Sequence, residues 1–234
     1  SIEAVAALCA PLPVLVIAEL LGISDADRAT FRRWSDAIIA IPDAPDAQQR
    51  RDAAELFAFL ADHVRAKGSV PEDDLVSKLT QAEVDGARLS HDELVMFCVT
   101  LLVAGNETTR HLLSGFLLAL ADHPAEWGRL GADPSLVVTA VEEALRWVTP
   151  VQAFARTVAR DTQVGGHRVR AGDYLVMLYA SGNRDEAAFG PTASDFDVTR
   201  PVDPTHVAFG FGEHLCLGAP LARLEARVVL AELL

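Results

Sequence analysis

The stretch 209–218 reads FGFGEHLCLG and holds a single cysteine, Cys216, between glycine-rich bends. The residues that follow, APLARLEARVVLAELL, predict a helix with Pro220 in its first turn. The amides at the start of a helix stabilise a thiolate, and Gly210 and Gly218 let the backbone lie close to a flat group. The pattern indicates an axial haem ligand, and a buried structural cysteine is the alternative. The expected apolar helix face consists of Leu217, Leu221, Leu224 and Val228.

Two other readings of this stretch lack support elsewhere in the chain. His214 could be taken for a zinc partner of Cys216, but there is no C-x-x-C motif and no second histidine pair to complete a metal cage. A Cys–His nucleophile pair is disfavoured because the two members of such pairs are usually distant in sequence.

The bulk composition limits the class of protein. The 234 residues are 50% hydrophobic, which is enough for a sizeable core. The formal charge of −13 argues against nucleic acid or an anionic membrane as the main partner, although Arg223 and Arg227 could form a local basic patch. Three scattered cysteines do not make a disulfide scaffold, so a reducing cytoplasm fits. The chain opens and stops inside helical patterns, and we expect a fragment.

Helical periodicity dominates the first 150 residues. Apolar runs predict a helix that closes at Gly22, another that starts at Ser24, and a third around 53–67. The longest helix begins at the Ser-x-x-Glu capping box of Ser90 and runs to Pro124, with Cys98 as a small core residue. Its apolar stretch is too short to cross a bilayer.

The later part of the chain changes character. Residues 134–149 predict one more helix, which Pro150 ends, and 154–180 predict a small antiparallel sheet, split by GG and AGD. Residues 181–206 predict a long meandering loop. Helices with a small segregated sheet make the fold class α+β, mostly α.

Two further motifs are chemically suggestive. AGNETTR, residues 104–110, places an acid, Glu107, and an alcohol, Thr108, inside the longest helix. A hydroxyl can bond the i−4 carbonyl and bend a helix, and a buried acid–alcohol pair suits a proton relay; a solvated patch is the alternative. In EEALR, Glu143 and Arg146 are spaced i,i+3, as in many exposed ion pairs.

Together these motifs resemble the cytochrome P450 monooxygenases of bacteria. FGFGEHLCLG looks like their haem-binding signature, Phe-x-x-Gly-x-(His/Arg)-x-Cys-x-Gly. AGNETT is similar to their oxygen-activation motif and EEALR to their Glu-x-x-Arg. The resemblance covers nearly all of residues 1–234, which it implies to be one partial P450 domain, helix-rich with a small antiparallel sheet. The family's N-terminal part and C-terminal sheet are missing.

The resemblance implies haem b as cofactor. Cys216 would be the proximal thiolate and the iron ligand, with Phe209 near the sulfur. His214 and Arg156 would hold the haem propionates. The remaining residues of the cofactor site would be Gly210, Gly218, Ala104 and Gly105, the last two leaving room for dioxygen.

The resemblance also implies the roles of the other motifs. Glu107 and Thr108 would deliver protons to dioxygen. Glu143, Arg146 and Arg200 would form a buried ion network that holds the loop under the haem. The expected substrate contacts are Val103, Val151, Gln152, Ala153 and Phe154, each of which could equally be a packing residue.

The implied reaction is monooxygenation of a small apolar substrate with O2. No flavin or iron–sulfur motif is visible, so a separate ferredoxin and its reductase would supply the electrons. Three alternatives stay open. They are a haem sensor or carrier without turnover, a fragment that is inactive as isolated, and a peroxide-using haem enzyme, which would not need the acid–alcohol pair.

Overall fold

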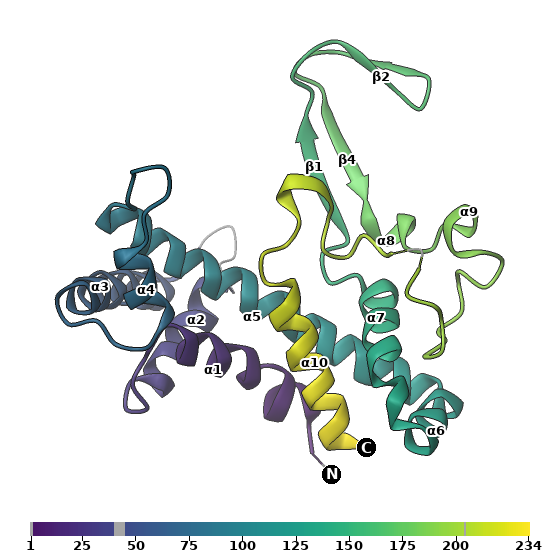
Figure 1. Cartoon of the computed structure of the whole chain (residues 1–234), viewed down its shortest axis with the longest axis horizontal. Helices are drawn as coiled ribbons and strands as arrows, with labels where there is room; N and C mark the ends of the chain where they lie inside the picture. The colour runs from purple at the N-terminus through teal and green to yellow at the C-terminus, as the bar shows by residue number, and fades with distance from the viewer. Residues whose placement is uncertain (1, 40–44, 204) are drawn as a thin grey trace. The chain divides into compact units, whose positions relative to one another are not determined.

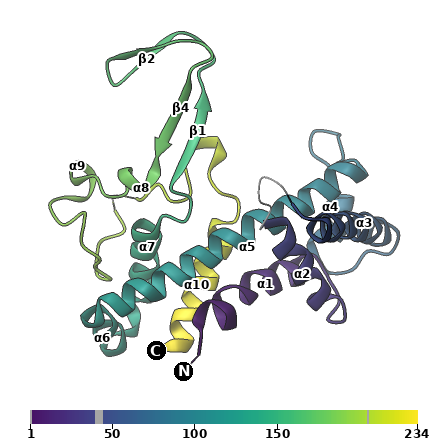
Figure 2. The ribbon, with the colours of Figure 1, turned by 180° about the vertical axis from the view of Figure 1, so that it is seen from behind.

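The computed structural model describes residues 2–39, 45–203 and 205–234. The chain divides into two compact units, Ser1–Arg110 and His111–Leu234. Both are built mainly from helices, and two small antiparallel sheets occur in the described part of the second unit (Figures 1 and 2). The mostly α, α+β fold class expected from the sequence is therefore confirmed.

The first unit is a helical assembly. Successive helices pack on one another, α1 on α2, α2 on α3 and α3 on α4. Its core contains Phe31, Leu56 and Leu60, which are fully buried. The elements are η1 (Val5–Cys9), α1 (Pro11–Leu20), α2 (Arg28–Ile39), α3 (Ala47–Ser69), α4 (Leu75–Gln81) and the first part of α5 (His91–Asp122).

Helix α5 begins where the capping box predicts. The Ser90 hydroxyl accepts the Glu93 amide at 3.3 Å, and Glu93 Oε2 accepts the Ser90 amide at 2.8 Å. Every residue from His91 to Asp122 is α-helical. Cys98 is buried as expected, and burial raises the pKa of its thiol to about 11.

The expected start of the second helix at Ser24 is wrong. The Ser24 hydroxyl donates to the carboxylate of Asp27 at 2.7 Å, and the Asp27 amide donates to the Ser24 carbonyl at 3.0 Å. These bonds close a turn over residues 24–27, so α2 begins only at Arg28. The Asp27 carbonyl then accepts the amide of Phe31, one turn into the helix.

The second unit combines helices with two hairpins. The meander expected as a loop over 181–206 begins inside one short helix, α8, and contains a second, α9; its Pro204 lies outside the described residues. Helices α7 and α10 pack on each other (Figures 1 and 2). The helices are the rest of α5, α6 (Pro124–Ala132), η2 (Pro134–Leu136), α7 (Val137–Val148), α8 (Tyr179–Gly182), α9 (Glu186–Phe189), η3 (Gly212–His214) and α10 (Ala219–Leu233).

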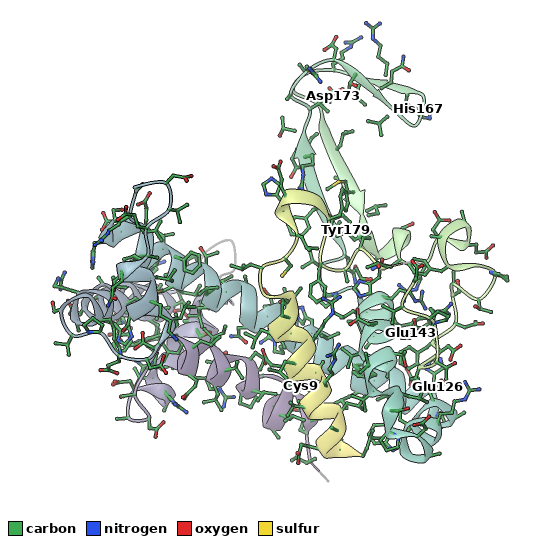
Figure 3. The ribbon with its side chains drawn as sticks, viewed as in Figure 1. Cys9, Glu126, Glu143, His167, Asp173 and Tyr179 are labelled. Carbon is green, nitrogen blue, oxygen red and sulfur yellow. The ribbon has the colours of Figure 1, made fainter. Side chains whose placement is uncertain are left out.

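The strands form two two-stranded sheets where the sequence predicted one. The strands are β1 (Ala153–Thr157), β2 (Thr162–Val164), β3 (His167–Val169) and β4 (Tyr174–Leu178). β1 pairs with β4, and β2 pairs with β3 across the turn at Gly165–Gly166. Both glycines have positive φ, 56° and 81°, as a tight two-residue hairpin turn requires. Figure 3 shows Tyr179 at one end of the β1–β4 ribbon and His167 and Asp173 toward the other.

The apolar face expected for the last helix is not its buried face. Leu217 precedes α10, and Leu217, Leu224 and Val228 are exposed. The buried side consists instead of Ala219, Glu225, Ala226, Val229 and Leu230. The segment carries apolar residues on two sides, so its spacing alone favours neither.

A glycine lets helix α5 approach α7 closely in the second unit. A Cβ on Gly115 would lie 2.7 Å from Val148 Cγ1. Alanine is a better helix former than glycine by about 1 kcal/mol, but overpacking a stiff side chain costs about 1–3 kcal/mol. We therefore expect Gly115→Ala to lower the denaturant midpoint of unfolding.

The matched control for this prediction is Gly128→Ala in α6, where a new Cβ would meet open space. That variant should raise the midpoint, because only the helix-propensity gain remains. Adding Val148→Ala to Gly115→Ala should recover part of the loss. A Gly115→Ala protein that is more stable than the parent would contradict the close approach.

Candidate functional site

Cys216 lies in a tight turn just before helix α10. Its amide donates to the Phe209 carbonyl at 3.0 Å, and its own carbonyl accepts the Ala219 amide at 3.3 Å. Gly210, inside the turn, has a φ of 70°, which favours glycine. A Cβ on Gly218 would lie 3.9 Å from Cys216 Sγ, so a larger side chain there would begin to cover the sulfur. The local backbone thus presents a free, exposed thiol at the start of a helix.

The surroundings of this thiol fit a flat apolar group. Phe211, Leu215 and Leu217 are between 58% and 77% exposed, although such side chains are usually buried. Among the described residues there is no group of three or more His, Cys, Asp or Glu side chains that could hold a metal ion. One thiol amid exposed apolar side chains fits an axial ligand of haem.

An aromatic series joins the cysteine turn to the β1–β4 hairpin. The ring of Tyr179 lies 6.4 Å from that of Phe211 and 5.7 Å from that of Phe154. The Tyr179 hydroxyl also lies 3.8 Å from where a Cβ on Gly210 would stand. Phe154 is one of the hairpin residues expected as substrate contacts, and through Tyr179 it links the hairpin to the cysteine turn. Ala153 and Gln152 are exposed nearby in sequence, and Val151 is half-buried.

The two expected propionate residues have exposed side chains. His214 ends η3, and its side chain is 79% exposed, 4.0 Å from the carboxylate of Glu213. Arg156 lies on β1, where its Nη1 donates to the Ala155 carbonyl at 2.8 Å. Neither side chain is tied into the protein interior, and both could turn toward an anionic ligand.

The acid–alcohol motif belongs to the first unit. The Thr108 hydroxyl donates to the Ala104 carbonyl at 2.7 Å, the i−4 bond expected from the sequence. Ala104 is exposed, and Glu107 and Val103 are half-buried. Gly105 lies against α1, since a Cβ there would come within 2.8 Å of Ile17 Cδ1. A larger side chain at position 105 would therefore collide with α1.

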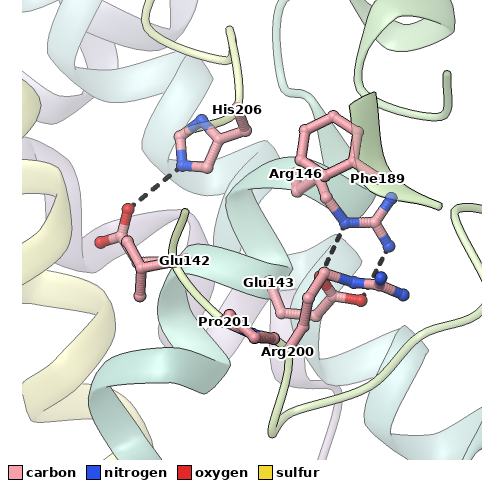
Figure 4. Close-up of a pocket in the computed structure, with 8 residues that line it drawn as sticks. Glu142, Glu143, Arg146, Phe189, Arg200, Pro201 and His206 are labelled. Carbon is pink, nitrogen blue, oxygen red and sulfur yellow. Dashed lines mark hydrogen bonds and ion pairs between the residues drawn. The ribbon is translucent and has the colours of Figure 1, made fainter. Parts of the chain in front are cut away.

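Glu143 and Arg146 form a buried ion pair on α7, and Arg200 joins it. Arg146 Nε and Nη2 donate to Glu143 at 2.7 and 2.8 Å, and Arg200 Nε donates to Glu143 Oε2 at 3.0 Å. Both Glu143 and Arg146 are 2% exposed. Figure 4 shows the three side chains converging. Such a network shapes a site more than it adds stability, because desolvation offsets the attraction between the charges.

The same arginine anchors the meander. Arg146 Nη1 donates to the carbonyls of Asn183 and Ala193, each at 2.7 Å, and Nη2 donates to that of Asp195 at 2.9 Å. Asn183 in turn accepts the amide of Val207 at 2.7 Å. The ion network therefore extends to the segment that leads into the cysteine turn.

Sequence reasoning missed four residues of this region. Asn183, Glu142 and His206 were not singled out, and Arg223 was expected in a basic patch. Arg223 donates instead to the carboxylate of Glu142, at 2.7 and 2.9 Å. A signal was present in EEALR, because two consecutive acids on a helix point in different directions and need different partners.

The described residues contain no helix that is both long and apolar enough to cross a membrane.

Comparisons with known proteins find similarity to cytochromes P450. A family model described as cytochrome P450 matches residues 135–234. Cytochrome P450 YjiB of Bacillus subtilis is 44% identical over 232 residues, which cover 96% of this chain and 58% of that protein. A steroid C26-monooxygenase of Mycobacterium tuberculosis is 44% identical over 223 residues, which cover 93% of this chain and 59% of that protein.

Solved structures agree with the sequence relatives. Cytochrome P450 CYP109Q5 from Chondromyces apiculatus matches with a TM-score of 0.91 and 42% identity, over 98% of this chain and 57% of its own. CYP109E1 from Bacillus megaterium, in complex with testosterone, matches with a TM-score of 0.91 and 37% identity, over 99% and 63%. The chain spans less than two thirds of each of these proteins.

Proposed function

We propose that the protein belongs to the cytochrome P450 family and is a haem-thiolate monooxygenase that binds haem b; its similarity to the P450 family model and to bacterial cytochromes P450 supports this. The observation that carries the proposal is the free, exposed Cys216 in its glycine-containing turn at the start of α10. Its amide is bonded to Phe209, and exposed apolar side chains surround it in sequence. Residues 1–234 would then be one partial P450 domain.

The proposed reaction converts a substrate C–H bond, O2, two electrons and two protons into an alcohol and water. One oxygen atom enters the C–H bond, and the other becomes the water. The haem supplies the activation of dioxygen when it is bound. The chain's own residues hold the cofactor, orient the substrate, exclude water and deliver protons.

Each residue group has a separate task in this proposal. Cys216 provides the axial sulfur, and the turn that contains Gly210 and Gly218 keeps that sulfur uncovered. His214 and Arg156 bind the propionates through their exposed polar ends. The network of Glu143, Arg146 and Arg200 holds the meander in place.

Within the first unit, Glu107 and Thr108 pass protons, and Ala104 and Gly105, which have little or no side chain, leave room for dioxygen. The proposed substrate contacts are Val103 in the first unit and Val151, Gln152, Ala153 and Phe154 in the second.

The partners and location follow from the same proposal. No flavin or iron–sulfur motif is present in the sequence, so an external ferredoxin and its reductase are the proposed electron donors. The substrate would be apolar and small; sterols, fatty acids, terpenoids and polyketides all meet that description. A cytoplasmic location agrees with three unpaired cysteines.

Carbon monoxide binding to the reduced, haem-loaded protein tests the proposal. Thiolate ligation should move the Soret band of the carbon monoxide complex strongly to the red. A band typical of histidine ligation, or a protein that takes up no haem, would count against it. A red-shifted band without turnover of any substrate would point to a haem sensor or carrier.

Removal of the Thr108 hydroxyl should uncouple electron flow from oxygenation. In Thr108→Ala, haem binding should persist, but reducing equivalents should leave as hydrogen peroxide, because the proton relay lacks its alcohol. The measurement is peroxide formed per NADH consumed with a surrogate ferredoxin system. We expect a rise of about tenfold or more, because a positioned acid–base group speeds a proton-transfer step by roughly 100-fold or more.

Thr100→Ala is the matched control, since the Thr100 hydroxyl makes the same i−4 bond, to Met96 at 2.8 Å, in the same helix. It should leave the peroxide yield unchanged. Equal yields from the two variants would remove Thr108 from the relay.

A further inference from the structure

Two consecutive glutamates of α7 serve different parts of the second unit. Glu143 faces Arg146 and Arg200, whereas Glu142 faces His206 (Figure 4). Glu142 Oε2 lies 3.2 Å from His206 Nε2. The second network has no place in the roles assigned above, so it needs an explanation of its own.

Glu142 is an anion held in a bidentate pair. Arg223 donates from Nε to Oε1 at 2.7 Å and from Nη2 to Oε2 at 2.9 Å. Burial by itself would raise the pKa of Glu142, but the hydrogen bonds from His206 and Arg223 outweigh burial and lower it to about 2. At neutral pH both members of the pair are therefore charged.

The arginine of this pair lies over the ring that begins the cysteine turn. The Arg223 guanidinium carbon is 4.7 Å from the centroid of the Phe209 ring, within cation–π range. The His206 ring lies 5.9 Å from the same ring. Phe209 is also the residue whose carbonyl accepts the amide of Cys216. Glu142 therefore contacts residues on both sides of the Phe209–Cys216 turn, His206 before it and Arg223 after it.

The Arg223 charge also lies close to the turn that holds Cys216, because it stands over the ring of Phe209, whose carbonyl accepts the Cys216 amide. The hydrogen bond to Glu142 raises the pKa of Arg223, so the guanidinium keeps its charge. A positive charge near the sulfur reduces the electron density that a thiolate donates to the iron. The two members of the ion pair should affect the sulfur in opposite directions, because their charges are opposite.

We propose that Glu142 and Arg223 are positioning residues for the thiolate: the pair fixes the Phe209–Cys216 turn, and its two opposite charges set the electrostatic potential at the sulfur. The inference rests on the proposed function, because it takes Cys216 as the haem ligand. Neither residue touches the reacting atoms.

The test combines two measurements on Glu142→Gln, Arg223→Gln and the double variant. The first is the reduction potential of the haem iron. Loss of the negative charge in Glu142→Gln should raise the potential, and loss of the positive charge in Arg223→Gln should lower it. The double variant should return close to the parent value. A role limited to packing would move all three in the same direction.

The second measurement is amide hydrogen exchange of residues 206–216 in the haem-free chain. Each variant should speed exchange at the Cys216 amide by about tenfold, as expected for the loss of a charged hydrogen bond. Arg168→Gln, which removes one positive charge from the exposed strand β3, is the control and should change neither readout.

The outcomes separate the two proposals. Shifts of opposite sign together with faster exchange support the inference. Shifts of equal sign, or exchange no faster than in Arg168→Gln, overturn it. If the parent protein binds no haem through sulfur, the proposed function fails, and the exchange measurement still decides whether the pair holds the turn.

Discussion

A Cys216→Ser variant is expected to lose the red-shifted carbon monoxide band completely. A serine hydroxyl has nearly the same shape as the thiol but is not an anion at neutral pH, so it cannot replace a thiolate as axial ligand. The turn should survive, because its bonds to Phe209 and Ala219 use the backbone of residue 216. The measurement is the absorption spectrum of the reduced protein with carbon monoxide.

The control for this variant is Cys98→Ala. Cys98 is buried in α5, and because its pKa is raised to about 11 it is a neutral thiol at pH 7. The variant should lose some stability from the small cavity and keep the full band. If Cys216→Ser retained the band, or if Cys98→Ala lost it, the assignment of the ligand would be wrong.

The largest loss of stability is expected from Arg146→Ala. The substitution removes five hydrogen bonds and leaves the buried Glu143 carboxylate with the Arg200 guanidinium and the Asp197 amide. Removal of one partner of a buried ion pair costs about 3–5 kcal/mol. The free energy of unfolding, measured by denaturant titration, should fall by that amount.

An exposed arginine of the same unit provides the comparison. Arg129 pairs with Glu126 at 3.6 Å and with Asp197 at 3.5 Å, and its side chain is 54% exposed. Arg129→Ala should cost about 0–1 kcal/mol, because solvent screens such pairs. Equal losses from the two variants would mean that the network around Glu143 does not hold the meander.

The sequence predicts those parts of the fold whose cause is local. The start of α5 follows from a capping box that both Ser90 and Glu93 complete, and the hairpin turn follows from Gly165–Gly166. The burial of Cys98 follows from an apolar run. The position of Cys216 before a helix follows from the glycines and Pro220, and the structure agrees.

The remaining features depend on partners that are distant in sequence. At Ser24 the local pattern allowed two outcomes, and the side-chain bond to Asp27 gives a turn in place of a helix cap. In α10 two sides are apolar, and packing on α7 decides which is buried. Arg223 looked like part of a basic patch because its partner, Glu142, is 81 residues away in the chain.

The central feature of the proposed site is a sulfur ligand of iron. Iron K-edge X-ray absorption of the haem-loaded protein measures this, because sulfur and nitrogen scatterers differ in distance and amplitude. We expect one sulfur in the first shell of the parent protein and of Cys98→Ala, and none in Cys216→Ser. A first shell of nitrogen and oxygen alone in the parent would contradict it.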